Sequence, residues 1–322
     1  MDEVAGSAPL VVGHRGFPAR FPEHTAAGFE AALEAGADVI EVDVVACSDA
    51  TLVARHDTAL AGTTDVADRV DLADRRSARR VAHEDVVDWW VDELTAAEVT
   101  SLRCRERWPH LRPGSAEFDG ADAVLTLADV LELARAAAAD RQRPVGVAIE
   151  LKDVEASALR GVDVVASLLR DLAVVAEPSV ATPVWVMAFE AGPLVRLKAL
   201  RDAGAAPAIP LVQLVQDAAP HGERAWDTIA ERADLVSLEL DLVLASAGAT
   251  NGAEVLRAAA DRRLPVWTWT LRAENAFLPE RLSRGEHPGD HGDVAVQVRE
   301  AVSRGVTGLV GDQPDVIRRA LS

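Results

Sequence analysis

Eight short apolar runs alternate with longer helical stretches along almost the whole chain, and this alternation limits the folds open to it. Runs of this kind are typical of strands that are covered on both faces. Parallel neighbours need a long crossover, which the helical stretches supply. Eight such units predict an α/β fold, a TIM (β/α)8 barrel, with an open doubly wound sheet as the alternative. The runs cover residues 10–14, 38–45, 145–152, 183–189, 210–215, 234–240, 265–270 and 308–312.

A ninth run, at residues 51–57, interrupts the alternation because only "CSDA" separates it from the second strand. That spacing is too short for a parallel crossover, so we expect an antiparallel hairpin that brings His56 back to the level of Asp43. After the hairpin, charged and irregular sequence predicts a functional lid or an insertion rather than a linker. The prediction is one α/β barrel domain over 1–322, with an insertion subdomain at about 58–123.

Composition restricts the partners of this chain. Its formal net charge of −19 repels nucleic acid and anionic membranes, so we expect neither a nucleic-acid partner nor stable membrane association. Cys47 and Cys104 are too few for a disulfide framework and lack metal-ligand spacing, which predicts two free thiols. The sequence shows no signal peptide and no membrane span, so we expect a soluble, cytoplasmic monomer or homodimer, or an exported protein if a signal was removed.

Carboxylates occupy the ends of two predicted strands. Glu41 and Asp43 share one face of the second strand because side chains alternate along a strand, and Glu150 ends the third. A half-exposed strand is the alternative for the first pair. Active sites of such barrels lie at the carboxyl ends of the strands. Three oxygen ligands there predict a site for a divalent metal ion, Ca²⁺ or Mg²⁺ rather than zinc.

Histidines and basic residues accompany these carboxylates. His14 ends the first strand and His56 ends the hairpin, and an acid and a base near neutral pKa are what a substitution reaction needs. Each histidine alone fits a structural role as well. Arg15 and Lys152 predict an anionic substrate, with phosphate as the leading candidate. Salt bridges to the carboxylates are the alternative.

Several motifs follow one another along the chain: "HRG", "PEHT", "GADVIEVDV", "ARHD", "TTDVADR" and "IELK", followed by "WTWTLRAENAFLPE" and "GVTGLVGDQPD". As an ordered set they resemble those of one family, the glycerophosphodiester phosphodiesterases. The last two resemble the subgroup that includes the periplasmic bacterial enzymes. The resemblance implies a barrel of the phospholipase C-like phosphodiesterase type, which hydrolyses glycerophosphodiesters to sn-glycerol 3-phosphate and an alcohol with a divalent metal ion. It also implies a place in glycerol and lipid metabolism.

The resemblance assigns roles to single residues. It makes His14 and His56 the acid/base pair of catalysis. The metal ligands would be Glu41, Asp43 and Glu150. The substrate-binding residues would be Arg15, Lys152, Phe189 and Trp269.

The opening motifs also carry expectations about backbone structure. Gly16 would let the chain turn close to the ligand, and Thr25 would cap the first helix. Glu23 would support the site without binding the metal. The sequence departs from the family pattern at Ala188, where a serine is common, and at Thr270 and Arg272.

Two other functions fit the same residues. A lysophospholipid or phosphoinositide phosphodiesterase would keep the site and add an apolar approach for an acyl chain, which the charged insertion disfavours. A catalytically inactive barrel that binds anionic metabolites would not need two histidines beside three carboxylates.

Overall fold

Eight parallel strands form a closed α/β barrel, as the alternation of the sequence predicts, and the open sheet is excluded. The computed structural model describes residues 8–81, 83–175, 182–216, 222–245 and 251–322. The strands are β1 (Leu10–Gly13), β2 (Val39–Ala46), β6 (Gly146–Leu151), β7 (Val184–Ala188), β8 (Leu211–Val215), β9 (Leu235–Glu239), β10 (Val266–Leu271) and β11 (Gly308–Gly311). Their order in the sheet is β1-β11-β10-β9-β8-β7-β6-β2, and β1 also pairs with β2.

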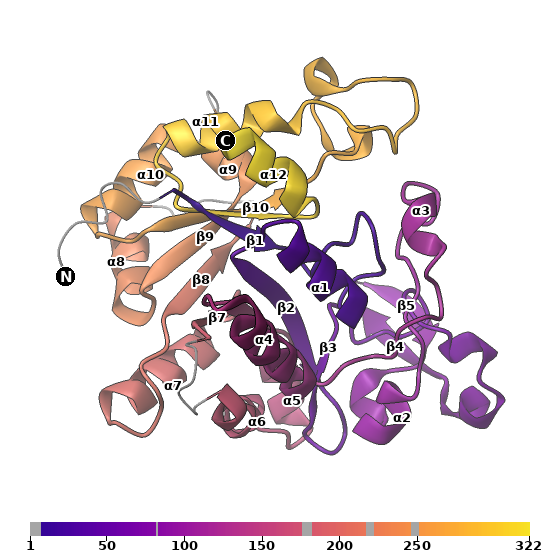
Figure 1. The fold of residues 1–322 in the computed structure, drawn as a ribbon. Coiled ribbons are helices and arrows are strands. Elements are labelled where there is room, and N and C mark those ends of the chain that lie inside the picture. The colour runs from indigo at the N-terminus through magenta and orange to yellow at the C-terminus, as the bar shows by residue number, and fades with distance from the viewer. Residues whose placement is uncertain (1–7, 82, 176–181, 217–221, 246–250) are drawn as a thin grey trace. The chain divides into compact units, whose positions relative to one another are not determined.

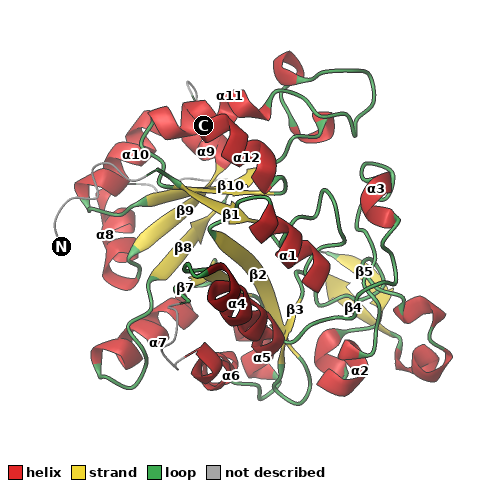
Figure 2. Ribbon diagram, viewed as in Figure 1, coloured by secondary structure: helices red, strands yellow, loops and turns green. Residues whose placement is uncertain are grey.

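Two compact units make up the chain. The first comprises Met1–His14, Ala32–Glu41 and Val184–Ser322, and the second comprises Arg15–Ala31 and Val42–Pro183. The strands of the first unit pair in parallel from β7 through β8, β9, β10 and β11 to β1. Helices alternate with these strands (Figure 2). They are α7 (Ala191–Asp202), α8 (Glu223–Arg232), α9 (Leu240–Leu244), α10 (Gly252–Asp261), α11 (Val294–Ser303), α12 (Pro314–Leu321) and the 3-10 helices η5 (Asn275–Phe277) and η6 (Glu280–Leu282).

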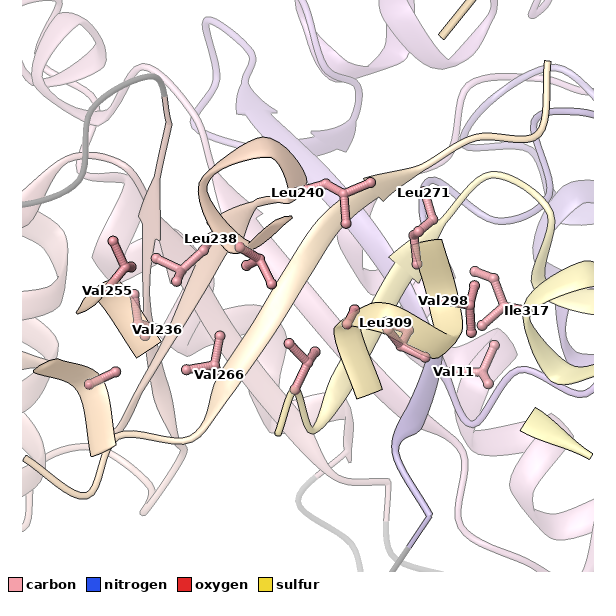
Figure 3. Close-up of a cluster of buried hydrophobic side chains, with 14 of the residues drawn as sticks. Val11, Val236, Leu238, Leu240, Val255, Val266, Leu271, Val298, Leu309 and Ile317 are labelled. Atoms are coloured by element: carbon pink, nitrogen blue, oxygen red, sulfur yellow. The ribbon is translucent and has the colours of Figure 1, made fainter. Parts of the chain in front are cut away.

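A hydrophobic core joins the strands and helices of the first unit (Figure 3). Val236 on β9 and Leu309 on β11 are fully buried, because strands of this kind are covered by helices. Val255 on α10, Val298 on α11 and Ile317 on α12 are the helical partners, and each is buried as well. Figure 1 shows these helices beside β1, β9 and β10. The helices therefore pack their apolar faces on these strands and hold them in place. Polar side chains lie at the carboxyl ends of the same strands.

The second unit contains the predicted hairpin. Strand β3 (Leu52–Ala54) pairs antiparallel with β2, with Val44 opposite Ala54 and Ala46 opposite Leu52. The helices of the chain up to Pro183 are α1 (Ala26–Glu34), α2 (Ala96–Thr100), α3 (Pro113–Ala116), α4 (Leu127–Arg141), α5 (Val154–Leu159) and α6 (Val164–Asp171), with the 3-10 helices η1 (Val66–Asp68), η2 (Val70–Arg75), η3 (Val91–Glu93) and η4 (Leu172–Val175). The Thr25 hydroxyl accepts a hydrogen bond from the Gly28 backbone N–H at 3.1 Å, which confirms the predicted cap of α1.

The insertion is more regular than its sequence suggests. It contains an antiparallel pair of strands, β4 (Ser77–Val81) and β5 (Glu84–Asp88), which Figure 1 shows in purple. Its buried residues, Trp89 and Leu102 among them, pack in one cluster with Val45 and Val53 of the hairpin. The insertion therefore has its own hydrophobic core, built on β2 and β3.

Both cysteines are free, as predicted, and the structure shows that both are buried. Burial raises the pKa of the Cys47 and Cys104 thiols to about 12, so both stay protonated at neutral pH. In the part of the chain that the structure describes, no helix combines the length and the apolar character needed to cross a bilayer. The cellular compartment stays a prediction.

Gly16 lies against the backbone of α1. Its φ is +91°, and a Cβ built there would lie 2.8 Å from the carbonyl carbon of Gly28. The close neighbour of Gly16 in the structure is a helix, and its approach to a ligand stays a prediction.

We expect Gly16→Ala to lower the free energy of unfolding by about 2–4 kcal/mol, because it combines left-handed strain with overpacking. Gly120 is the matched control: its φ is +81° and no atom lies within 4 Å of its built Cβ. Gly120→Ala should lose only about 1–2 kcal/mol, from strain alone. Urea unfolding measures both. An equal loss of unfolding free energy in the two variants would show that the close contact with Gly28 does not contribute.

Candidate active site

Three buried carboxylates meet near the carboxyl ends of β2 and β6. Carboxylate oxygens of Glu41, Asp43 and Glu150 lie within 4.8 Å of one another. Glu41 and Asp43 point to the same face because they are two positions apart on β2. The structure thus brings the three predicted ligands together, and their exposed fractions are all below 9%.

The electrostatics of this cluster reflect crowded negative charge. Burial and the nearby Asp43 carboxylate raise the pKa of Glu150 to about 8. Burial also opposes ionisation of Asp43, but the charges of Lys152 and Arg15 outweigh it and hold the pKa of Asp43 well below its usual range. Three buried oxygen donors that repel one another suit a hard divalent cation, so the donor set fits the metal that the sequence predicts.

Arg15 and Lys152 form ion pairs with this cluster. Lys152 Nζ lies 2.6 Å from Glu150 Oε1 and 3.4 Å from Asp43 Oδ1, and Arg15 Nε lies 3.1 Å from Asp43 Oδ2. The salt bridges considered as an alternative are therefore present. They do not exclude phosphate binding, because these pairs place two cations beside the carboxylates.

His24 is a member of the site that the sequence did not indicate. Its Nε2 lies 3.1 Å from Asp43 Oδ2 and its side chain is buried. Both Arg15 and His24 have left-handed backbones, with φ of 53° and 60°, and the His24 N–H donates to the Arg15 carbonyl at 3.0 Å. Such conformations are costly for residues with a Cβ. Here they direct two side chains onto one carboxylate.

His14 belongs to a buried triad in the first unit. Its Nδ1 lies 2.6 Å from Asp312 Oδ1, and Asp312 Oδ2 accepts a hydrogen bond from Arg272 Nε at 2.9 Å. Asp312 is 1% exposed. The carboxylate holds the proton on Nδ1, so Nε2 is the atom able to exchange a proton with a reactant. Asp312 follows β11 directly, and the rule that polar groups gather after strand ends could have indicated it.

His56 belongs to a similar triad in the second unit. Its Nδ1 lies 2.6 Å from Asp57 Oδ1, and Asp57 Oδ2 accepts a hydrogen bond from Arg107 Nη1 at 2.6 Å. Burial opposes ionisation of Asp57, but the hydrogen bond from His56 and the charge of Arg107 lower its pKa strongly. The Arg55 N–H donates to the Asp43 carbonyl at 2.9 Å, so the hairpin returns to the predicted level.

Two aromatic side chains of the first unit contact each other at the ends of β7 and β10. The rings of Phe189 and Trp269 are 5.6 Å apart between centroids and meet edge to face. Phe189 is 38% exposed, which leaves its ring accessible to a ligand. The Trp269 indole N–H donates to the Ser237 carbonyl at 3.2 Å and is thereby fixed. Arg272, which departs from the family pattern, stacks on Phe277 and binds Asp312.

Comparison with known proteins identifies the family of this chain. The fold and the carboxylate cluster together define a class: the α/β-barrel proteins that have a polar site at the carboxyl ends of their strands. The model of the Glycerophosphoryl diester phosphodiesterase family matches residues 14–316, so the chain belongs to this family.

Curated relatives match parts of the chain. A glycerophosphodiester phosphodiesterase of Arabidopsis thaliana is 31% identical over 147 residues, which are 46% of this chain and 38% of that protein. A probable glycerophosphodiester phosphodiesterase of Mycobacterium tuberculosis is 48% identical over 63 residues, which are 20% of this chain and 23% of that protein. The chain thus spans less than half the length of these relatives.

Solved structures share the fold over nearly the whole chain. A glycerophosphoryl diester phosphodiesterase described as putative, from Silicibacter pomeroyi, has a TM-score of 0.67 at 22% identity and covers 98% of this chain and 94% of its own. A phosphodiesterase of Oleispira antarctica, solved with the product sn-glycerol 3-phosphate, has a TM-score of 0.66 at 18% identity, with 98% and 97% covered. The periplasmic subgroup stays a prediction.

Proposed function

We propose that this chain is a glycerophosphodiester phosphodiesterase, which hydrolyses glycerophosphodiesters to sn-glycerol 3-phosphate and an alcohol such as choline, ethanolamine or glycerol. The observation that carries the proposal is the buried carboxylate cluster of Glu41, Asp43 and Glu150 in a chain of this family. The product bound to the Oleispira antarctica phosphodiesterase supports the same substrate class.

Glu41, Asp43 and Glu150 would hold the divalent metal ion, Ca²⁺ or Mg²⁺. A bound cation of this kind withdraws charge from the phosphodiester oxygens. Arg15 and Lys152 would bind the same oxygens with hydrogen bonds from charged donors, which are stronger than those of neutral groups. Their pairing with Asp43 keeps both side chains oriented before substrate arrives.

His14 and His56 would exchange the protons of the reaction. One Nε2 would take the proton from the nucleophile, and the other would give a proton to the leaving alkoxide. The carboxylates of Asp312 and Asp57 support this role, because each holds the Nδ1 proton of its histidine and stabilises the imidazolium. Phe189 and Trp269 would border the organic part of the substrate with their rings.

The nucleophile would be either water or the glycerol hydroxyl of the substrate. Attack by the hydroxyl gives a cyclic glycerophosphate, which water then opens, whereas attack by water gives the product directly. Trapping the cyclic phosphate during turnover, followed by phosphorus NMR, separates the two routes.

We expect purified protein with Ca²⁺ or Mg²⁺ to release sn-glycerol 3-phosphate from glycerophosphocholine, and an enzymatic assay for that product to detect it. Lysophosphatidylcholine and a phosphoinositide belong in the same panel. Turnover of these lipids without turnover of glycerophosphocholine would reject the proposed substrate. Tight calorimetric binding of sn-glycerol 3-phosphate by a protein that turns over none of them would instead indicate a binding barrel.

A further inference from the structure

One arginine of the insertion contacts two carboxylates of the second unit. Arg107 Nε and Nη2 donate to Glu23 Oε2 and Oε1 at 2.8 Å and 2.6 Å, and its Nη1 donates to Asp57 Oδ2 at 2.6 Å. Asp57 in turn holds His56 Nδ1 at 2.6 Å. The guanidinium of Arg107 therefore binds three carboxylate oxygens. Asp57 links it to the ring of His56.

The charges of this network are fixed. Burial opposes ionisation of Glu23, but the charge of Arg15 and the hydrogen bonds of Arg107 lower its pKa well below the usual range. Burial likewise disfavours the charged form of Arg107, but its two carboxylate partners outweigh that and raise its pKa. The planar fork of arginine fits this task, because it holds donors on three separate nitrogens in a rigid plane, whereas all three donors of lysine lie on one nitrogen.

The segment that carries Arg107 is held in place by its neighbours. The Glu106 carboxylate accepts hydrogen bonds from the Trp108 N–H at 2.8 Å and from the Ser115 hydroxyl at 2.5 Å. The Arg105 N–H donates to the Thr63 carbonyl at 2.9 Å. These contacts hold the backbone at 105–108 without help from the Arg107 side chain. The fixed backbone directs the guanidinium of Arg107 toward Glu23 and Asp57.

The two histidine triads differ in what orders them. Asp312, the partner of His14, is 1% exposed and accepts a hydrogen bond from Arg272. The side chains of His56 and Asp57 are 33% and 38% exposed. Partly exposed pairs of this kind contribute little by themselves, because holding both side chains in one geometry costs conformational entropy. The imidazole of His56 binds Oδ1 of Asp57, and among the contacts described above Arg107 is the one that holds the other oxygen, Oδ2.

We propose that Arg107 is a positioning residue, which orders the His56–Asp57 pair and so makes the proton transfer of His56 efficient. This inference rests on the proposed function, since it needs a reaction in which His56 exchanges a proton. Arg107 does not contact the reacting atoms in this account. It acts on the rate through the orientation of Asp57 and the imidazole ring.

The experiment begins with Arg107→Ala and glycerophosphocholine. We expect kcat to fall about 10- to 100-fold, the range for supporting residues around a site, with KM changed by less than about threefold. Arg105→Ala is the matched control, because Arg105 lies on the same segment and pairs with the exposed Asp68 at 2.5 Å. It should keep the kcat and KM of the unaltered chain.

A double-variant cycle then asks whether Arg107 acts through His56. In a His56→Ala background, Arg107→Ala should cost less than about twofold further in kcat, because the positioned group is gone. The same loss in both backgrounds, or a loss confined to KM, would overturn the inference. If Arg107→Ala does not fold, Arg107→Lys replaces it: a kcat within twofold of the unaltered chain would overturn the inference, and a loss of about 10-fold would support it.

Failure of this inference and of the proposed function are distinguishable. An unaltered chain that releases no sn-glycerol 3-phosphate rejects the function. An active chain whose Arg107→Ala variant keeps full kcat rejects only the positioning role.

Discussion

Replacing His14 or His56 with alanine is expected to lower kcat on glycerophosphocholine by about 10²- to 10⁴-fold each, the usual contribution of general acid–base catalysis. Each variant should also lose one limb of a bell-shaped pH dependence of kcat. His110→Ala is the control, because His110 is an exposed histidine of the insertion. Circular dichroism of each variant checks that the fold is kept.

Full activity in both histidine variants would reject the acid/base assignment. Loss in only one would leave a single proton-transfer group, with water in the other role. Because the triads resemble each other, Asp312→Asn and Asp57→Asn should each lower kcat as well, by an amount smaller than removal of the histidine.

Removal of divalent metal is expected to abolish turnover, because the proposed site then lacks the cation that withdraws charge from the phosphodiester oxygens. Dialysis against EDTA followed by addition of Ca²⁺, Mg²⁺ or Mn²⁺ measures the loss and its recovery. Asp43→Asn should lose activity and also the rise in melting temperature that metal gives the unaltered chain. Glu30→Gln, an exposed carboxylate on α1, is the control for charge.

Full turnover in EDTA would contradict the metal proposal. Calorimetric binding of the same metal to Asp43→Asn with unchanged affinity would contradict the ligand assignment. The second readout does not depend on catalysis, so it tests the carboxylate cluster even if the substrate is another phosphodiester.

The barrel was predictable because its strands have a strong local signal. The run at 145–152 is apolar up to Ile149, and the structure places β6 within a residue of the predicted bounds. The hairpin followed from the short spacing alone. By contrast β4 and β5 escaped prediction, because their residues are polar and mostly exposed and so carry no pattern of burial.

The supporting contacts of the site could not be read from the sequence. Arg107 reaches Glu23 across 84 positions of the chain and Asp57 across 50, and Asp312 reaches His14 across 298. No local pattern encodes such pairs, and the insertion has charged residues at many positions with no role in the site. The carboxylates were easier, because strand alternation alone places Glu41 and Asp43 on one face.

The two ends of the insertion lie next to each other. The Ala54 N–H donates to the Leu125 carbonyl at 2.8 Å, so the chain leaves the hairpin and returns to it at adjoining backbone positions. Because the two ends adjoin, the insertion of one relative can replace that of another. Segments of different length can start and end at the same two backbone positions. If Arg107 positions His56 as proposed, a graft that omits an equivalent arginine would lower kcat about 10- to 100-fold in an enzyme whose barrel strands are untouched. Exchange of this segment would therefore transfer catalytic competence together with any preference for the alcohol.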